Sequence, residues 1–228
     1  MSVISIAFYA PMPAIARHLL QIPLVLLIIA FVPGNAAKLA ALLLVWALTF
    51  GRLSRLEAIF YLAVCVFFTA MNAASLKQGI FAFSQPDLLG MPWYELFMWG
   101  FYLLHLRRVL DGPAPLGRRG PVWALAILYA LAFGTIQDGN MLLLVTGVLL
   151  AAGLLLFHEQ GDLLYTGYLV LLGALIEYTG VHSGQWHYPG NPVGGVPLWF
   201  ITLWGGVGLL MRRLILPILA RFEARTGA

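Results

Sequence analysis

Charge and cysteine are both scarce in this chain of 228 residues. Only 10% of the residues are charged, 61% are hydrophobic, and the mean hydropathy is +0.90. This composition excludes a soluble globular domain and is typical of a polytopic α-helical membrane protein. The one cysteine, Cys65, lies within an apolar run, which excludes an intrachain disulfide or a metal site built from cysteines. We expect it to be a small buried hydrophobic residue.

Several chemical motifs are also missing. The chain has no aspartate-rich motif that would hold magnesium and a diphosphate, which argues against prenyl chemistry initiated by ionisation. It has no G-x-S-x-G nucleophile elbow, P-loop, dinucleotide-binding fingerprint or HxxxH box of the membrane di-iron enzymes. Its arginines are not interleaved with aromatic residues, as they would be in a nucleic-acid-binding surface. We therefore expect no cofactor and no nucleic-acid partner.

The apolar runs predict an all-α integral membrane protein with about eight spans of ~20 residues or fewer. These spans are expected at roughly 18–33, 37–51, 56–75, 92–106, 121–136, 141–157, 163–180 and 196–211. Residues 1–17 are expected to form an interfacial lead-in. Because it is long for the charged region of a signal peptide, an uncleaved first helix is favoured. Residues 1–228 are expected to form a single integral membrane domain.

The basic residues divide unequally between the two sides of this predicted bundle. Only Lys38 and Lys77 fall on one side, while the other carries eleven arginines: Arg17, Arg52, Arg55, Arg107, Arg108, Arg118, Arg119, Arg212, Arg213, Arg221 and Arg225. Because cytoplasmic loops carry the excess of positive charge, both termini are predicted to be cytoplasmic in a multi-pass protein of the cell inner (plasma) membrane. The net charge of +4 is explained by this topology better than by an anionic partner.

One stretch of the chain occurs twice. Gly184–Arg213 aligns without a gap on Gly79–Arg108, at a shift of 105 residues. Identical positions are Gly79/Gly184, Gly90/Gly195, Pro92/Pro197, Trp99/Trp204, Gly100/Gly205, Leu104/Leu209 and the arginine pairs Arg107-Arg108/Arg212-Arg213. A shift that covers four spans predicts two parallel four-helix repeats, approximately 18–110 and 121–215, related by an axis along the membrane normal. The loops 76–91 and 181–196 then both lie on the outer side.

Two acidic residues are predicted at membrane depth, where ionisable groups are costly and usually functional. Glu177 lies about one turn from the outer end of the seventh span, and its counterpart in the first copy is Asn72. Glu95 lies in the first turn of the fourth span, opposite Phe200 in the second copy. We expect the two carboxyl groups to converge on one outward-facing cavity near the pseudo-twofold axis.

A carboxyl group in an apolar site stays protonated near neutral pH and can act as a general acid. Glu177 is therefore predicted to be the general acid, with Glu95 as partner base or electrostatic stabiliser. The alternatives are structural: Glu95 as a solvated acid that favours the helix dipole, and Glu177 as a buried, hydrogen-bonded acid that fixes helix packing.

Aromatic and polar side chains around these acids are predicted to line the substrate site. They are Asn72, Trp93, Tyr94, Trp99, Tyr178, His182, Trp186, His187, Tyr188, Trp199 and Trp204. Aromatic ring faces stabilise a carbocation by cation–π attraction. The alternative is an aromatic belt at the membrane interface.

The histidines allow a metal or haem alternative. His182 and His187 are expected to form interfacial hydrogen bonds or to shuttle protons, and with Glu177 they are also a candidate zinc or iron site. His105, near the inner end of the fourth span, would need a partner at matching depth to ligate haem, and none is evident.

The repeated stretch has the order acid, glycine, aromatic-x-aromatic, glycine-rich loop and proline before a helix. In the second copy these elements are Glu177, Gly184, Trp186-His187-Tyr188, Gly194-Gly195 and Pro197, and in the first Asn72, Gly79, Phe81-Ala82-Phe83, Gly90, Pro92 and Glu95. Around half of the chain thus resembles the repeated domain of the small membrane lycopene cyclases, and the related carotenoid hydratase-like and membrane meroterpenoid cyclase families.

This resemblance implies an enzyme that acts on an isoprenoid lipid by proton-initiated cyclisation or hydration. The lycopene cyclase pattern has paired acids after the proline in both copies, whereas this chain has Glu95 alone in the first and none in the second. The resemblance therefore implies a different substrate or a non-enzymatic relative. The parallel repeats with a central polar pair also suit a non-catalytic binder or transporter of a lipid or small molecule.

Overall fold

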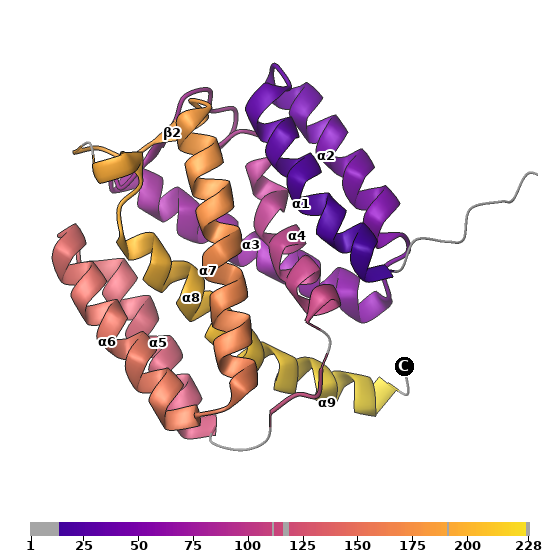
Figure 1. The fold of residues 1–228 in the computed structure, drawn as a ribbon, viewed down its shortest axis with the longest axis vertical. Helices are drawn as coiled ribbons and strands as arrows, with labels where there is room; N and C mark the ends of the chain where they lie inside the picture. The colour runs from indigo at the N-terminus through magenta and orange to yellow at the C-terminus, as the bar shows by residue number, and fades with distance from the viewer. Residues whose placement is uncertain (1–13, 111, 116–118, 191, 227–228) are drawn as a thin grey trace, which may run out of the picture.

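The computed structural model describes residues 14–110, 112–115, 119–190 and 192–226, and its helices pack as shown in Figure 1. They are α1 (Ala14–Phe31), α2 (Asn35–Phe50), α3 (Arg55–Lys77), α4 (Glu95–Val109), α5 (Arg119–Thr135), α6 (Gly139–Phe157), α7 (Gln160–His182), α8 (Trp199–Leu210) and α9 (Leu216–Thr226). The predictions for Arg118 and for the lead-in up to residue 13 lie outside the described residues.

Four helical segments are long and apolar enough to cross a membrane, judged by length and composition. They are α3, α6, α7 and the continuous stretch Trp199–Arg225. Two shorter apolar helices, Ile15–Phe31 and α2, accompany them. The predicted class, a helical membrane protein, is confirmed at this level.

The third helix of each predicted copy begins with a capping box, in which a side chain near the helix start accepts a backbone N–H three residues away. At the start of α3, the Ser54 hydroxyl accepts the Glu57 N–H at 3.2 Å, and the Glu57 carboxylate accepts the Ser54 N–H at 2.9 Å. At the start of α7, the Asp162 carboxylate accepts the Glu159 N–H at 3.2 Å. These side chains satisfy amides that the first turn of a helix leaves without partners.

The helix of the last predicted span, 196–211, continues beyond its expected end. The helix passes from α8 through a π-helical turn, Met211–Ile215, and continues as α9. Both arginines bind acidic groups at the start of α7, so their charges serve packing and do not mark a helix terminus. In the first copy, α4 ends at Val109, one residue beyond Arg108 and three beyond the expected end at 106.

Two short strands, which the all-helical prediction did not include, join the repeated loops. β1 (Ala82–Phe83) pairs antiparallel with β2 (Trp186–His187), with Ala82 opposite His187. These two facing residues occupy equivalent positions of the sequence repeat, since they are 105 residues apart. A local twofold axis between the copies would produce such a register. We call the end of the molecule that carries these strands the ribbon end.

The helix pairs α3–α4 and α7–α8 also pack in the same way. Gly100 lies against Tyr61 and Cys65, and a Cβ there would come within 2.6 Å of either side chain. Gly205 lies against the residues found 105 positions later, Thr166 and Val170. In Figure 1 the hairpins α1–α2 and α5–α6 lie on opposite sides of these helices. The arrangement supports the predicted repeats, which remain a prediction.

Candidate functional site

The Glu177 carboxylate is surrounded by three hydrogen-bond donors. Its Oε2 atom accepts the Trp186 indole N–H at 3.1 Å and the Tyr188 hydroxyl at 2.8 Å. Its Oε1 atom accepts the Trp204 indole N–H at 3.3 Å. An indole nitrogen only donates, so the two tryptophans can face this group only as donors. The surroundings of Glu177 therefore suit a negatively charged carboxylate.

Two glycines of α7 make room for these indoles. Gly173 and Gly180 lie four residues before and three residues after Glu177, so all three share one face of the helix. A Cβ at Gly173 would lie 2.3 Å from Trp204, and one at Gly180 would lie 2.0 Å from Trp186. Each ring thus packs directly on the helix backbone, which brings its N–H to the carboxylate between them.

Glu95 makes a different set of contacts. Its Oε1 atom accepts one hydrogen bond, from the Asn72 side-chain amide at 3.0 Å. Asn72 occupies in the first copy the position that Glu177 occupies in the second. The two carboxyl groups lie within electrostatic range of each other. We call Glu95 and Glu177 the acid pair.

Tyr102, which was not among the predicted site residues, also belongs to this site. It is buried, and its hydroxyl has no hydrogen-bond partner among the described residues. It lies within electrostatic range of both acids. Since Tyr102 follows Glu95 by seven residues, two helical turns, the spacing alone would have placed it on the same face.

Stacked aromatic rings form one wall of the site. The rings of Trp99 and Trp204 stack with centroids 4.5 Å apart, and Trp99 also stacks on Phe68 at 4.0 Å. The Tyr102 ring lies 5.4 Å from that of Trp204. Trp99 was predicted to line the site, whereas Phe68 was missed because it sits within an unbroken apolar run of α3.

Four further predicted aromatic residues lie around the ribbon end in varied settings. Tyr94 is buried and Trp93 is 42% exposed. Trp199 packs edge-on against Tyr188, with ring centroids 5.8 Å apart. Tyr178 contacts Phe200, at a centroid separation of 6.0 Å. Trp93 thus fits the interfacial belt, and Tyr94 the interior.

The proposed metal site does not form. His182 and His187 are exposed, and His182 Nδ1 is 2.9 Å from the carbonyl oxygen of Tyr178. No group of three or more histidine, cysteine, aspartate or glutamate side chains among the described residues is placed to hold a metal ion. His182 follows Glu177 by five residues, about 140° further around the helix, so the two point to different faces.

His105 is engaged on both ring nitrogens. Nδ1 is 3.0 Å from the side-chain oxygen of Gln21, and Nε2 is 2.6 Å from the Tyr168 hydroxyl. Neither nitrogen is free for iron, so the geometry does not support a haem ligand. A cavity of about 20 Å³, enough for about one water molecule, lies between His105 and Tyr102.

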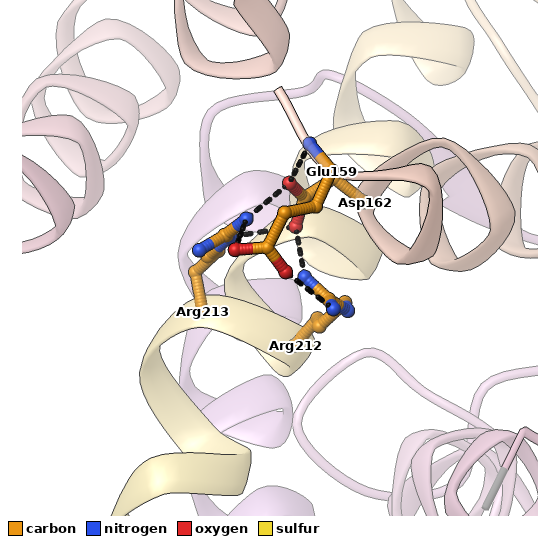
Figure 2. Close-up of polar contacts among 4 residues, drawn as sticks. All are labelled: Glu159, Asp162, Arg212 and Arg213. Atoms are coloured by element: carbon orange, nitrogen blue, oxygen red, sulfur yellow. Dashed lines mark hydrogen bonds and ion pairs between the residues drawn. The ribbon is translucent and has the colours of Figure 1, made fainter. Parts of the chain in front are cut away.

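The four repeated arginines lie at the opposite end of the bundle, where each forms an ion pair with an acidic side chain. We call this end the arginine end. In the second copy, Asp162 accepts hydrogen bonds from Arg212 at 2.7 Å and from Arg213 at 2.6 Å (Figure 2). Glu159 contacts both arginines at 2.8 Å. These hydrogen bonds, the one from Arg212 foremost, hold the pKa of Glu159 below its ordinary value.

The first copy has a related ion pair. Arg108 binds both carboxylate oxygens of Glu57, at 2.7 and 2.9 Å. Shifting these two residues by 105 positions gives Asp162 and Arg213. Neither ion pair was predicted, although an acid stands at the same point of each sequence copy, Glu57 in the first and Asp162 in the second.

The described helices and this site define a helical membrane protein with a partly buried pair of carboxyl groups. Comparison with the profiles of known protein families, with curated proteins and with solved structures found no match to the chain.

Proposed function

We propose that the chain crosses the membrane eight times, as two parallel four-helix repeats with both termini in the cytoplasm, in the cell inner (plasma) membrane. The ribbon end then faces outward. Related contacts at a constant shift of 105 residues support this arrangement, among them the ion pairs Glu57–Arg108 and Asp162–Arg213. The arginine end carries the excess positive charge that cytoplasmic loops carry.

We infer that the protein is an enzyme acting on an isoprenoid or similar membrane lipid by proton-initiated cyclisation or hydration, as the resemblance to the membrane lycopene cyclases implies. One observation carries this proposal: the Glu177 carboxylate of the acid pair accepts a hydrogen bond from Trp204, whose ring stacks on that of Trp99. A carboxyl group in a poorly solvated site supplies a proton, and aromatic faces stabilise the cation that results.

The hydrogen bonds favour a division of roles opposite to the predicted one. Two neighbouring carboxyl groups in a poorly solvated site do not both ionise. Glu177 faces three donors, whereas Glu95 accepts one hydrogen bond from Asn72. Glu177 is therefore assigned as the charged partner that stabilises the cation, and Glu95 as the proton donor.

The reaction balances with Glu95 as proton donor and then proton acceptor, and hydration consumes one water molecule. Glu95 transfers its proton to a carbon–carbon double bond, whose electrons form the new C–H bond and leave a tertiary carbocation. In cyclisation, a second double bond supplies the electrons of the new C–C bond, and the resulting cation returns a proton to Glu95, giving an isomer. In hydration, water adds to the cation and then returns a proton to Glu95.

The test is turnover of polyprenyl alcohols and linear carotenoids by the purified protein in lipid nanodiscs. Glu95→Gln is expected to lower turnover by about 10²-fold or more, the usual contribution of a general acid. Glu177→Gln should lower it as well, whereas Glu223→Gln, at the arginine end, should not. Unchanged turnover in both acid-pair variants would refute the assignment.

A second candidate is a binder or transporter of a lipid or small molecule. It is favoured by a polar cavity of about 300 Å³ at the ribbon end. Transport predicts flux of the ligand across proteoliposomes without product, whereas the enzyme predicts product without flux.

A further inference from the structure

The cavity at the ribbon end, which we call the outer cavity, contains a buried lysine. It has a volume of about 300 Å³ and is lined by the start of α2, by the two repeated loops and by Tyr94. Lys38 lines it too and is only 5% exposed. A cationic side chain is rarely this buried without a partner of opposite charge.

The Lys38 ammonium group has one neutral hydrogen-bond partner. It donates to the side-chain oxygen of Gln185 at 2.7 Å and lies 6.0 Å from the centroid of the Tyr94 ring. No carboxylate of the described residues lies within ion-pair distance of it. Since an ammonium group has three N–H donors, two remain for a ligand in the cavity.

The start of α2 adds positive charge to the same cavity. Gly34, at the N-cap position, provides no side chain to accept the first amides of the helix. In the second copy, α6 begins after Asp138, whose carboxylate accepts the Met141 N–H at 2.8 Å. The second copy thus supplies its own anion at this position, whereas the first copy supplies none.

The acidic side chain of the loop 76–91, Asp87, is hydrogen-bonded to groups other than Lys38. Asp87 accepts hydrogen bonds from the Asn35 side chain at 2.8 Å and from the Trp93 N–H at 3.0 Å. It does not line the cavity. A ligand in the cavity therefore meets the ammonium group of Lys38 and the amide end of α2.

We propose that the outer cavity binds a phosphate group, with Lys38 as its charge partner and the first amides of α2 as further donors. A phosphate accepts several hydrogen bonds and is favoured at the positive end of a helix. The cavity is larger than a phosphate and has polar walls, so it also accommodates the group that carries it. The site explains why Lys38 departs from the charge asymmetry of the chain, and it does not depend on the chemistry of the acid pair.

Two probes distinguish a soluble anion from a lipid headgroup. Inorganic phosphate is titrated calorimetrically into protein held in phosphatidylcholine nanodiscs. Retention of phosphatidic acid is measured by native mass spectrometry, with phosphatidylcholine as the neutral reference. Binding of free phosphate indicates a soluble ligand, and selective retention of phosphatidic acid alone indicates a lipid.

Variants of the lysine decide the assignment. Lys38→Gln should weaken binding by about tenfold or more, the effect of losing one charge-assisted contact. Lys38→Arg should retain binding, and Lys77→Gln, which removes the other lysine of the predicted outer side, should not change it. If neither probe binds, or if Lys38→Gln binds as the wild type does, the proposal is wrong.

A second variant keeps the test decisive if Lys38→Gln fails to fold. Gln185→Glu places a carboxylate on the ammonium group and supplies the missing counter-charge from within the chain. The variant should fold, as judged by a single species in size-exclusion chromatography, and should no longer bind either probe. Undiminished binding by folded Gln185→Glu would overturn the proposal.

Discussion

The indole rings of Trp99 and Trp204 stack at 4.5 Å with an angle of 25° between their planes, and the two residues occupy equivalent positions of the repeat. Of these two tryptophans, Trp204 donates a hydrogen bond to Glu177, as Trp186 and Tyr188 also do, whereas no such bond from Trp99 is observed among the described residues. Trp99 and Trp204 thus both form the aromatic wall, and Trp204 also contacts a member of the acid pair.

The hydrogen bond from Trp204 is expected to hold the Glu177 carboxylate in place. Trp204→Phe keeps an aromatic ring and removes the N–H, so it should lower the free energy of unfolding by about 1–3 kcal/mol. The loss is measured by thermal unfolding in detergent. Trp123→Phe, at an exposed position of α5, should change stability little. An equal loss in the two variants would contradict this role of the indole N–H.

The glycines beside Glu177 are expected to tolerate no side chain. Gly173→Ala and Gly180→Ala force the Trp204 and Trp186 rings away from α7, and overpacking of this kind costs about 1–3 kcal/mol. Gly167→Ala is the matched control on the same helix, since a Cβ there meets nothing within 4 Å. It should be neutral or stabilising because alanine favours the helix. Equal melting temperatures for the three variants would show that a Cβ at Gly173 or Gly180 does not displace the indole rings.

The ion pair between Asp162 and Arg213 is expected to stabilise the fold. Both side chains are buried. Asp162→Asn leaves Arg213 with Glu159 as its remaining acidic partner, and Arg213→Ala leaves Asp162 with Arg212, so each variant loses charge-assisted hydrogen bonds at a cost of about 1.5–3 kcal/mol. Arg221→Ala, at an exposed position of α9, should have little effect. The measurement is the yield of monodisperse protein together with its thermal unfolding. Wild-type yield and stability in both ion-pair variants would refute this role.

Stability should also fall in acid through Glu159. Hydrogen bonds from Arg212 and Arg213 lower the pKa of this carboxyl in the folded state, so its contribution is present at neutral pH. The contribution is lost as the pH falls below about 4, where the carboxyl becomes protonated. Glu159→Gln should lower stability at neutral pH and flatten the loss on acidification. A variant that keeps the acid slope of the wild type would point to other groups.

The positions of the helices follow from the apolar runs, because in an apolar environment a helix satisfies the backbone N–H and C=O groups within its own segment. The ends were less predictable. Arg212 and Arg213 resemble a helix stop, but their partners lie about 50 residues earlier, on α7, and such contacts leave no local signal.

The candidate site was predicted in part. Glu95 and Glu177 stand out because acids are rare in apolar helices, and Trp99, Trp186, Tyr188 and Trp204 were expected near them. Tyr102 was not predicted, because its type does not distinguish it from the other aromatic residues of the same apolar run. The environment of Lys38 depends on three segments that meet only in the folded chain, so its sequence position revealed no more than an exception to the charge rule.

The pairing of β1 with β2 carries a consequence for how the two halves differ. In a symmetric dimer of one half, a residue near the twofold axis would meet its own copy, as Ala82 meets its counterpart His187 here. Any acid added near that axis would then face an identical acid. Joining the halves in one chain removes this restriction, so a position can hold an acid in one half and an amide in the other, as Glu177 and Asn72 do. Covalent linkage thus permits a single charge where a symmetric assembly would impose two.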